Sequence, residues 1–150
     1  MSRLSRHLYI AGSLGLLAVA GLHTWGHLSS NPRDPQYASF MEPMRAFVLK
    51  GMGVAKDPSV ADVYESMSWF ISIALAALGF MSLAAFRDRR DPELPPPGAL
   101  KVNLLAVGAM VLLWGVYNLA PPFYTLLFVQ ILFIACWAFR SAAARRAGVQ

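Results

Sequence analysis

The sequence predicts an all-α polytopic membrane protein: a four-transmembrane-helix up-down bundle with an amphipathic helix in its first outer loop. Hydrophobic residues make up 57% of the chain and charged residues 14%, whereas a soluble domain carries about 25% charged residues. Four apolar segments approach the roughly 20 residues that a membrane-spanning helix needs. Basic residues gather beside these segments. The length of 150 residues predicts a single transmembrane domain, residues 1–150.

Composition also excludes some classes of function. The formal net charge is +5, but no basic run alternates with aromatic residues, so we expect no nucleic-acid partner. The single cysteine, Cys136, excludes an intramolecular disulfide and any dithiol chemistry that needs a cysteine pair. We expect the lipid bilayer to be the main partner.

The first expected span covers residues 8–28 and follows the basic residues Arg3 and Arg6. Its composition is mostly Leu, Ala, Gly and Val. A basic head followed by an apolar run and Ala18-Val19-Ala20 also resembles a secretory signal peptide with its cleavage motif. Because the apolar run is long enough to cross a bilayer, we interpret it as the first transmembrane helix.

The outer loop, residues 29–65, contains four prolines and is expected to be partly ordered. A short amphipathic helix is predicted over Pro43–Met52, which would act as a lid. Its apolar and basic positions recur at helical spacing, and its methionines would form an adaptable lining. The apolar positions are Met44, Phe47, Val48 and Met52, and the basic positions are Arg45 and Lys50. The lining methionines are Met41, just before this helix, Met44 and Met52.

Asp57-Pro58 is typical of a helix start, with Asp as the N-cap and Pro in the first helical position. The second long helix is expected to begin there and to run to Phe86, with residues 66–86 inside the membrane. A stiff, charged, proline-rich cytoplasmic linker follows over residues 87–98.

The last two spans are predicted over residues 99–118 and 122–139. Ala120-Pro121-Pro122 between them favours a tight reversal, because proline cannot continue the interior of a helix. A basic tail follows. Lys and Arg residues are concentrated on the side that holds both termini, and the positive-inside rule therefore predicts cytoplasmic termini in a bacterial inner (plasma) membrane.

Small and polar residues indicate the helix faces that meet inside a membrane bundle. One expected face of the first helix contains His27, His23, Ala20, Leu16 and Gly12. The second helix has a stripe that starts at Glu65, and the third has a stripe that ends at Asn118. The members of these last two stripes are Glu65, Ser68, Ser72, Ala76, Gly79, Gly108, Val111, Gly115 and Asn118.

Polar residues predicted at the outer end of the bundle suggest a pocket there, and the inner half shows no comparable set. His23 and His27 are four residues apart and share one helix face. Together with Glu65 they are the candidate catalytic or ligand-anchoring groups, because a carboxyl–imidazole pair can move a proton without a cofactor. The candidate ligand-binding residues are Ser68, Ser72, Tyr117, Asn118, Tyr124 and Gln130; Gln130 would form the floor of the pocket.

Two alternative roles stay open for these residues. His23, His27 and Glu65 form a donor set used by zinc and non-haem iron, although the glutamate of the H-E-x-x-H motif is absent. Alternatively, the polar groups lie at the membrane interface and only satisfy neighbouring helices, as in a non-catalytic accessory subunit. Haem bound between the two histidines is excluded, because neighbours on one face cannot approach iron from opposite sides. No cofactor is required.

A resemblance adds to this interpretation. Gly21-Leu22-His23, Met44-Arg45, Trp69-Phe70-Ile71-Ser72 and Gly79 are similar to the pattern of a family of small uncharacterised four-helix bacterial membrane proteins. The resemblance covers the first half of the chain and implies the four-span topology. The polar pocket, and not this resemblance, predicts the function: we expect the protein to bind a lipophilic small molecule, with or without converting it by acid/base chemistry. A homo-oligomer or a larger membrane complex stays open.

Overall fold

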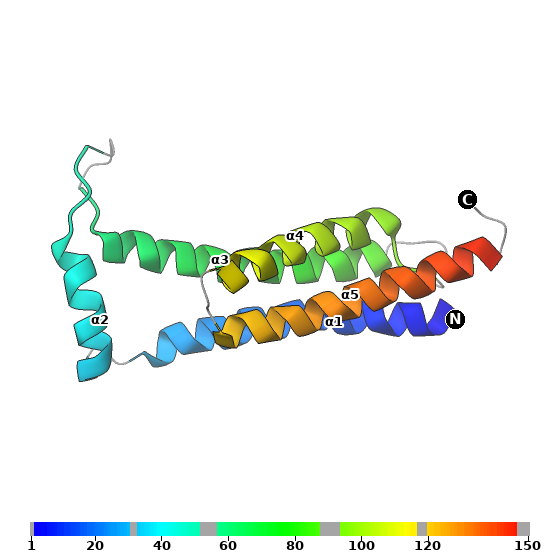
Figure 1. Ribbon diagram of the computed structural model, residues 1–150, viewed down its shortest axis with the longest axis horizontal. Helices are drawn as coiled ribbons and strands as arrows, with labels where there is room; N and C mark the ends of the chain where they lie inside the picture. Colours follow the sequence, from blue (N-terminus) through cyan, green and yellow to red (C-terminus); the bar gives the residue numbers. More distant parts are fainter. Residues whose placement is uncertain (1, 31–32, 52–56, 88–93, 117–119, 147–150) are drawn as a thin grey trace. The chain divides into compact units, whose positions relative to one another are not determined.

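The computed structural model describes residues 2–30, 33–51, 57–87, 94–116 and 120–146, and these ranges contain five helices (Figure 1). The helices are α1 (Ser2–Ser29), α2 (Pro35–Ala46), α3 (Val60–Arg87), α4 (Pro97–Val116) and α5 (Ala120–Arg146). The four long helices are long and apolar enough to cross a membrane. The predicted all-α fold with four spans is therefore confirmed.

The amphipathic helix in the first loop lies earlier than predicted. Helix α2 begins at Pro35, and Asp34 is its N-cap, with a side chain that accepts a hydrogen bond from Gln36 N at 2.8 Å. The helix ends at Ala46, because Phe47 is extended. The prediction of a helix over Pro43–Met52 was wrong at both ends, and Met52 lies outside the described residues.

Helix α3 begins at Val60 rather than at Pro58, because Ser59 and Asp62 form a reciprocal cap. Asp62 Oδ2 accepts hydrogen bonds from Ser59 N at 2.8 Å and from Ser59 Oγ at 2.7 Å, and Asp62 N donates back to Ser59 Oγ at 3.2 Å. Asp57 has another role: its Oδ1 accepts a hydrogen bond from Gly51 N at 3.2 Å. Asp57 therefore bonds to the backbone of the loop and is not the N-cap of α3.

Prolines lie in the first turn of each of the last two helices. Pro97 is the first residue of α4, and α5 begins at Ala120, so Pro121 and Pro122 lie in its first turn. A missing N–H costs nothing at these positions, because the first amides of a helix have no partner within it. The tight reversal predicted at Ala120-Pro121-Pro122 is wrong, because these residues form the start of α5; residues 117–119 lie outside the described ranges.

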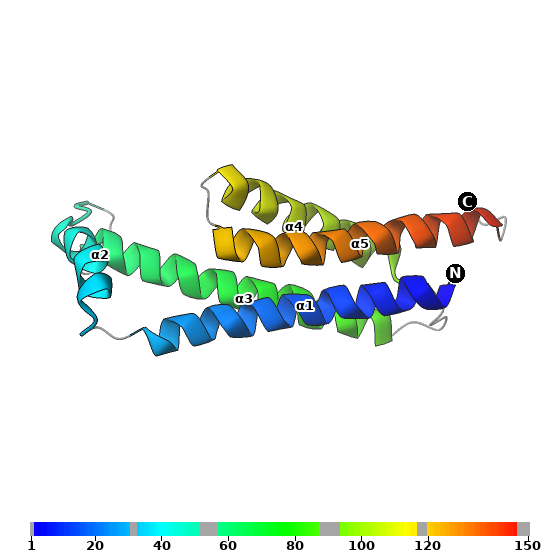
Figure 2. The same ribbon diagram turned by 60° about the horizontal axis from the view of Figure 1, so that its bottom comes forward.

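Contacts divide the chain into two compact units. Unit 1 comprises Met1–Val19 and Leu75–Gln150, and unit 2 comprises Ala20–Ala74. In unit 1, Figures 1 and 2 both show α4 and α5 alongside each other. The ring of Phe123 lies near Gly115 at one end of this helix pair, and Lys101 lies over the ring of Trp137 at the other. The two helices are therefore antiparallel.

Close packing in unit 1 depends on glycines. A Cβ atom built on Gly12 would lie 2.8 Å from the Phe133 ring, and one on Gly79 would lie 2.7 Å from the Leu17 side chain. Together with the hydrogen bonds of Ser5 with Cys136 and of Tyr9 with Ser82, these contacts make α1 antiparallel to both α5 and α3, as an up-down bundle requires. They confirm the small-residue faces predicted for Gly12 and Gly79. The core of unit 1 includes Tyr9, Leu16, Leu75, Leu100, Val107, Leu126, Val129, Phe133 and Cys136.

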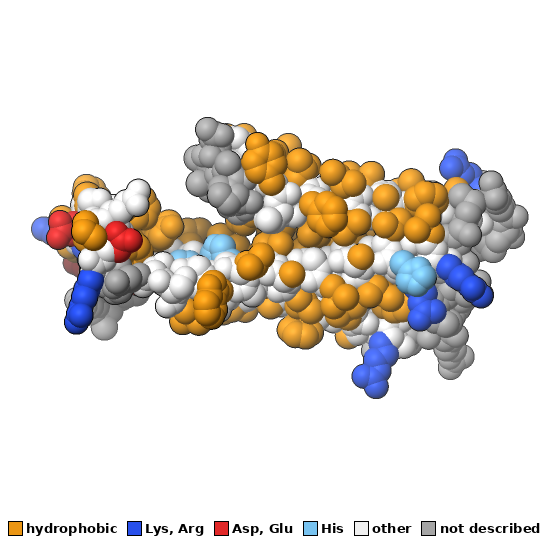
Figure 3. All heavy atoms as spheres, turned by 90° about the horizontal axis from the view of Figure 1, so that it is seen from below, with side chains coloured by type: hydrophobic (Ala, Val, Ile, Leu, Met, Phe, Trp, Pro, Cys, Tyr) orange, Lys and Arg blue, Asp and Glu red, His pale blue; other side chains and the backbone are white. Residues whose placement is uncertain are grey.

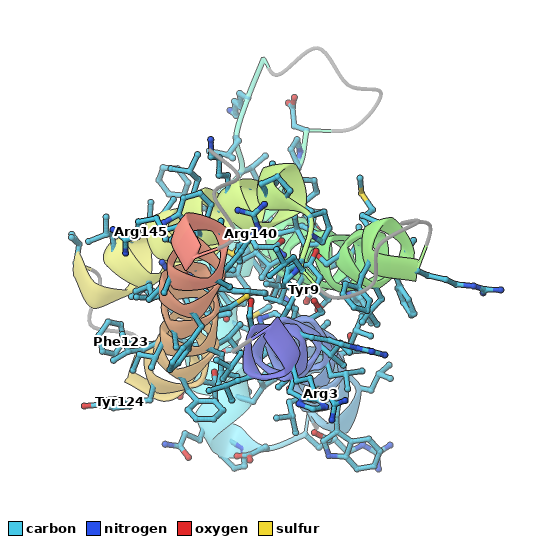
Figure 4. The ribbon with its side chains drawn as sticks, turned by 90° about the vertical axis from the view of Figure 1, so that its right-hand side faces the viewer. Arg3, Tyr9, Phe123, Tyr124, Arg140 and Arg145 are labelled. Atoms are coloured by element: carbon cyan, nitrogen blue, oxygen red, sulfur yellow. The ribbon has the colours of Figure 1, made fainter. Side chains whose placement is uncertain are left out.

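Unit 1 also contains buried polar groups at the end where α1 begins. Tyr9 Oη donates to the carbonyl of Ser82 at 3.1 Å, and Asn103 Nδ2 donates to Ser82 Oγ at 2.7 Å. Figure 4 shows Tyr9 directed in among the helices. Ser5 Oγ donates to the carbonyl of Cys136 at 3.3 Å. The expectation that this half of the bundle has no polar set was wrong. These groups satisfy one another between helices, as a membrane interior requires.

Unit 2 contains the end of α1, all of α2 and the start of α3. The loop after α2 returns to α3 through an isolated antiparallel bridge between Val48 and Ser59. In this bridge, Leu49 N donates to the carbonyl of Pro58 at 2.9 Å. The ring of Phe40 packs against that of Tyr64 at 5.7 Å between centroids, so α2 contacts the first turns of α3.

Candidate functional site

Two histidines and two serines meet in unit 2, where the last turns of α1 lie against α3. His23 and His27 are one helical turn apart on α1, and Ser68 and Ser72 are one turn apart on α3. Because the two segments are antiparallel, His23 faces Ser72 and His27 faces Ser68. The predicted helix faces are thus confirmed for these four residues. We call them the His/Ser cluster.

Hydrogen bonds join the four side chains into a row. His23 Nδ1 lies 2.9 Å from Ser72 Oγ, and His27 Nε2 bonds to Ser68 Oγ. A longer contact of 3.5 Å joins Ser68 Oγ to His23 Nε2. The row therefore runs from His27 through Ser68 and His23 to Ser72. Both serines are buried and both histidines are half-buried.

Two aromatic rings, those of His23 and Trp69, lie beside the imidazole of His27. The imidazoles of His23 and His27 lie 5.1 Å apart between ring centroids, and Trp69 stacks on His27 at 5.6 Å with an interplanar angle of 26°. This stacking fixes the plane of the His27 ring. Trp69 belongs to the similarity pattern seen in the sequence and fits an aromatic belt at the membrane interface, but its contact with His27 was not predicted. Helical spacing could not have indicated this contact, because Ser68 and Trp69 do not share a helix face.

One nitrogen of the row is open. No residue in the described ranges forms a hydrogen bond with His27 Nδ1. The buried side-chain polar atom that lacks a partner in these ranges is Gln130 Oε1, so His27 Nδ1 is not sealed inside the protein. A molecule at the surface of unit 2 can reach it.

Glu65, the third candidate catalytic residue, is half-buried on α3, one turn before Ser68. No other described residue forms a hydrogen bond or an ion pair with its carboxylate. Within the described ranges, no three His, Cys, Asp or Glu side chains are grouped so that they could hold a metal ion. His23, His27 and Glu65 therefore do not form the donor set that the metal hypothesis needs.

The other candidate ligand-binding residues are not joined to the His/Ser cluster by any contact among the described residues. Tyr117 and Asn118 fall outside the described residues. Tyr124 belongs to unit 1, has 66% of its surface exposed and points outward from α5 (Figure 4). Gln130, also in unit 1, points toward α4, and its Nε2 donates to the carbonyl of Leu104 at 3.2 Å. Neither side chain belongs to the His/Ser cluster.

Comparisons of the chain with protein-family models, curated proteins and solved structures found no match. The resemblance seen in the sequence therefore stays a prediction, and functional arguments depend on the geometry of the chain itself.

Proposed function

We propose that this protein binds a lipophilic small molecule that carries a hydroxyl or carbonyl group, and that His27 Nδ1 forms a hydrogen bond with that group. The observation that carries the proposal is the row of hydrogen bonds that ends at an open imidazole nitrogen. An imidazole in a membrane segment is costly to keep unless it has a partner or a task. His23 has partners at both nitrogens, whereas His27 has one left to offer.

The row supports either kind of hydrogen bond to a ligand. When Ser68 donates its hydroxyl proton to His27 Nε2, Nδ1 carries the other ring proton and can donate to a carbonyl. When His27 Nε2 donates to Ser68, Nδ1 is an acceptor and can bind a hydroxyl. Ser68 then donates to His23, and His23 donates to Ser72. The acid/base part of the proposal concerns His27 alone: when Nδ1 takes a proton from the ligand, the ring becomes an imidazolium whose Nε2 donates to Ser68, and the ligand is left as the conjugate base.

The surroundings favour an apolar ligand body. Large hydrophobic side chains next to the cluster on α1 and α3 are exposed on the surface of unit 2. They are Leu22, Trp25, Met67, Trp69 and Phe70. A ligand with an apolar chain can lie against Trp69, whose ring stacks on that of His27, while its polar end reaches His27. Binding sites of this kind combine an apolar lining with a few placed polar groups.

Histidine NMR tests the proposal. Protein labelled with ¹⁵N at its imidazoles is titrated in detergent micelles with 2-decanone, 1-decanol and decane. We expect the two polar probes to shift the ¹⁵N resonances of His27 and, through Ser68, those of His23. Decane has the same apolar body but no hydrogen-bonding group, so it should leave them unchanged. His7, at the other end of α1 and exposed, is the internal control.

Three variants make the test specific. His27→Ala should abolish the response of His23, and Tyr124→Phe should preserve it. Glu65→Gln should also preserve it, because the carboxylate of Glu65 has no bond to the cluster. Equal responses to decane and 2-decanone, or a response that survives His27→Ala, would overturn the proposal. Either outcome would favour the accessory-subunit hypothesis, in which the histidines only join α1 to α3.

We further infer that the protein lies in a bacterial inner membrane with both termini in the cytoplasm. Basic residues at the ends of the helices in unit 1 support this orientation through the positive-inside rule. These residues are Arg3, Arg6, Arg87, Lys101, Arg140 and Arg145. Alkaline phosphatase fused after Gln150 should be inactive, and a fusion within residues 33–51 should be active. The reverse pattern would contradict the orientation.

A further inference from the structure

Cationic side chains gather at the end of unit 1 where α1 and α4 begin and α3 and α5 end. On the face seen in Figure 3, the Lys and Arg side chains of unit 1 lie toward this end, and hydrophobic side chains cover much of the surface beside them. The described residues of unit 1 include no Asp or Glu; Asp88, Asp91 and Glu93 of the linker lie outside these ranges. This end therefore presents positive charge directly beside an apolar surface.

Two of these cations are held in place where α4 begins and α5 ends. Lys101 Nζ lies over the ring of Trp137, 5.8 Å from its centroid. Arg140, one turn after Trp137, donates from Nε to the carbonyl of Pro95 at 3.0 Å. Figure 4 shows Arg140 and Arg145 at this end of α5. The Nε contact fixes the Arg140 guanidinium, and no other residue in the described ranges forms a hydrogen bond with its remaining N–H groups, which can donate to an anion.

An apolar surface begins one turn further along both helices. Leu105 follows Lys101 by one turn on α4 and is 76% exposed, and Ile134 precedes Trp137 by one turn on α5 and is 52% exposed. A molecule bound here would meet two cations and an indole first, and then aliphatic side chains. A membrane phospholipid with an anionic headgroup has this order of chemical groups.

We propose that Lys101, Trp137 and Arg140 bind the headgroup of an anionic phospholipid, whose acyl chain lies along Leu105 and Ile134. The cations contact the phosphate, and the indole N–H of Trp137 is suited to the interface between headgroup and hydrocarbon. A free phosphate ion would use the same cations but would gain nothing from the apolar residues. This dependence on both parts distinguishes a lipid site from a simple anion site.

The test measures lipid binding to the full chain in detergent by native mass spectrometry. Phosphatidylglycerol is titrated against phosphatidylcholine. A basic residue near a membrane surface contributes about a fivefold increase in affinity for anionic lipid. We therefore expect Lys101→Gln/Arg140→Gln to weaken phosphatidylglycerol binding by about thirtyfold and to leave phosphatidylcholine binding unchanged. Arg45→Gln/Lys50→Gln removes two charges from unit 2 and should retain the preference.

Further variants separate a lost site from lost folding. Lys101→Arg/Arg140→Lys keeps both charges and should retain the preference for phosphatidylglycerol, whereas Leu105→Ser/Ile134→Ser should reduce it. An equal loss in the Arg45/Lys50 control would overturn the proposal, because net charge alone would then explain binding. Thermal stabilisation by inorganic phosphate equal to that by phosphatidylglycerol would also overturn it, since the site would then bind free anions.

Discussion

The side chains of His23 and Ser72 join α1 to α3 through a hydrogen bond of 2.9 Å between Nδ1 and Oγ. One turn along each helix, His27 and Ser68 repeat the same pairing. The repeat follows from helix geometry, because residues four apart on antiparallel helices meet in successive layers. The two layers are not equivalent, since Ser68 also contacts His23 at 3.5 Å. This difference leads to a first prediction.

Ser68→Ala should disturb both imidazoles directly, whereas Ser72→Ala should disturb His23 directly and His27 less, through Ser68. Removing Ser68 Oγ deprives His27 Nε2 of its partner and breaks the row, but removing Ser72 Oγ leaves the bond between His27 and Ser68 intact. Long-range ¹H–¹⁵N spectra, which report the tautomer of each ring, measure the change. Each substitution should cost about 0.6 kcal/mol of stability, the average for hydrogen bonds between membrane helices. An unchanged His27 spectrum in Ser68→Ala would contradict the hydrogen-bonded row.

A second prediction concerns the close approach of α1 and α3 in unit 1. A Cβ atom on Gly79 would lie 2.7 Å from Leu17 Cδ2 and 3.0 Å from the backbone oxygen of Ser13. The backbone oxygen cannot rotate away, so Gly79→Ala should force the helices apart and cost about 1–3 kcal/mol. Thermal unfolding in detergent measures the loss.

Gly21→Ala is the matched control for Gly79→Ala. Nothing lies within 4 Å of the Cβ position of Gly21, which is also helical. Alanine there should be neutral or stabilising by up to about 1 kcal/mol, because it lowers the entropy of the unfolded chain. Equal destabilisation by both substitutions would show that the clash at Gly79 is not the cause.

Local sequence signals predicted which segments are helical better than they predicted the residues at which the helices begin and end. Asp-Pro occurs at Asp34-Pro35 and again at Asp57-Pro58, and the same dipeptide does different things. Asp34 caps α2, whereas Asp57 bonds to Gly51 and leaves the cap of α3 to Ser59. The role of each Asp depends on which backbone N–H its carboxylate can reach. For Asp57 this is the N–H of Gly51, whose φ is 79°, and the pattern of apolar residues does not predict this contact.

Helical spacing alone identified the His/Ser cluster but not the polar groups of unit 1. The two histidines and two serines form regular stripes, so one helix face predicts them. Tyr9 lies three residues before Gly12 and Ser82 three residues after Gly79, so both extend the predicted stripes by one turn, whereas Asn103 lies outside the predicted stripe of its helix. Tyr9 and Asn103 each donate a hydrogen bond to Ser82 across a helix interface. Such pairs depend on which helices are neighbours and in what register, and one sequence does not contain this information. Glu65 lies on the same predicted stripe as Ser68 and Ser72, but its side chain does not bond to the His/Ser cluster.

A third prediction uses the contact between Gly12 and Phe133. A Cβ atom on Gly12 would meet atoms of the Phe133 ring at 2.8, 3.0 and 3.1 Å, and the atoms it would meet belong to the side chain. Gly12→Ala should therefore destabilise the protein by about 1–3 kcal/mol. Phe133→Leu in the same chain should relieve the clash and recover part of the loss, although Phe133→Leu alone removes buried surface. Strictly additive effects in this double-mutant cycle would contradict direct contact.

The last prediction concerns the thiol of Cys136, which is fully buried and donates to the carbonyl of Ser5 at 3.3 Å. Because a maleimide must reach the sulfur atom, folded protein should react slowly, and the thiol should become reactive once sodium dodecyl sulfate unfolds the chain. A local opening free energy of about 3 kcal/mol would slow labelling about a hundredfold. Ser39→Cys in a Cys136→Ala background places a thiol at an exposed position of α2 and should react at once. Rapid labelling of Cys136 in the folded protein would show that α1 and α5 do not pack as described.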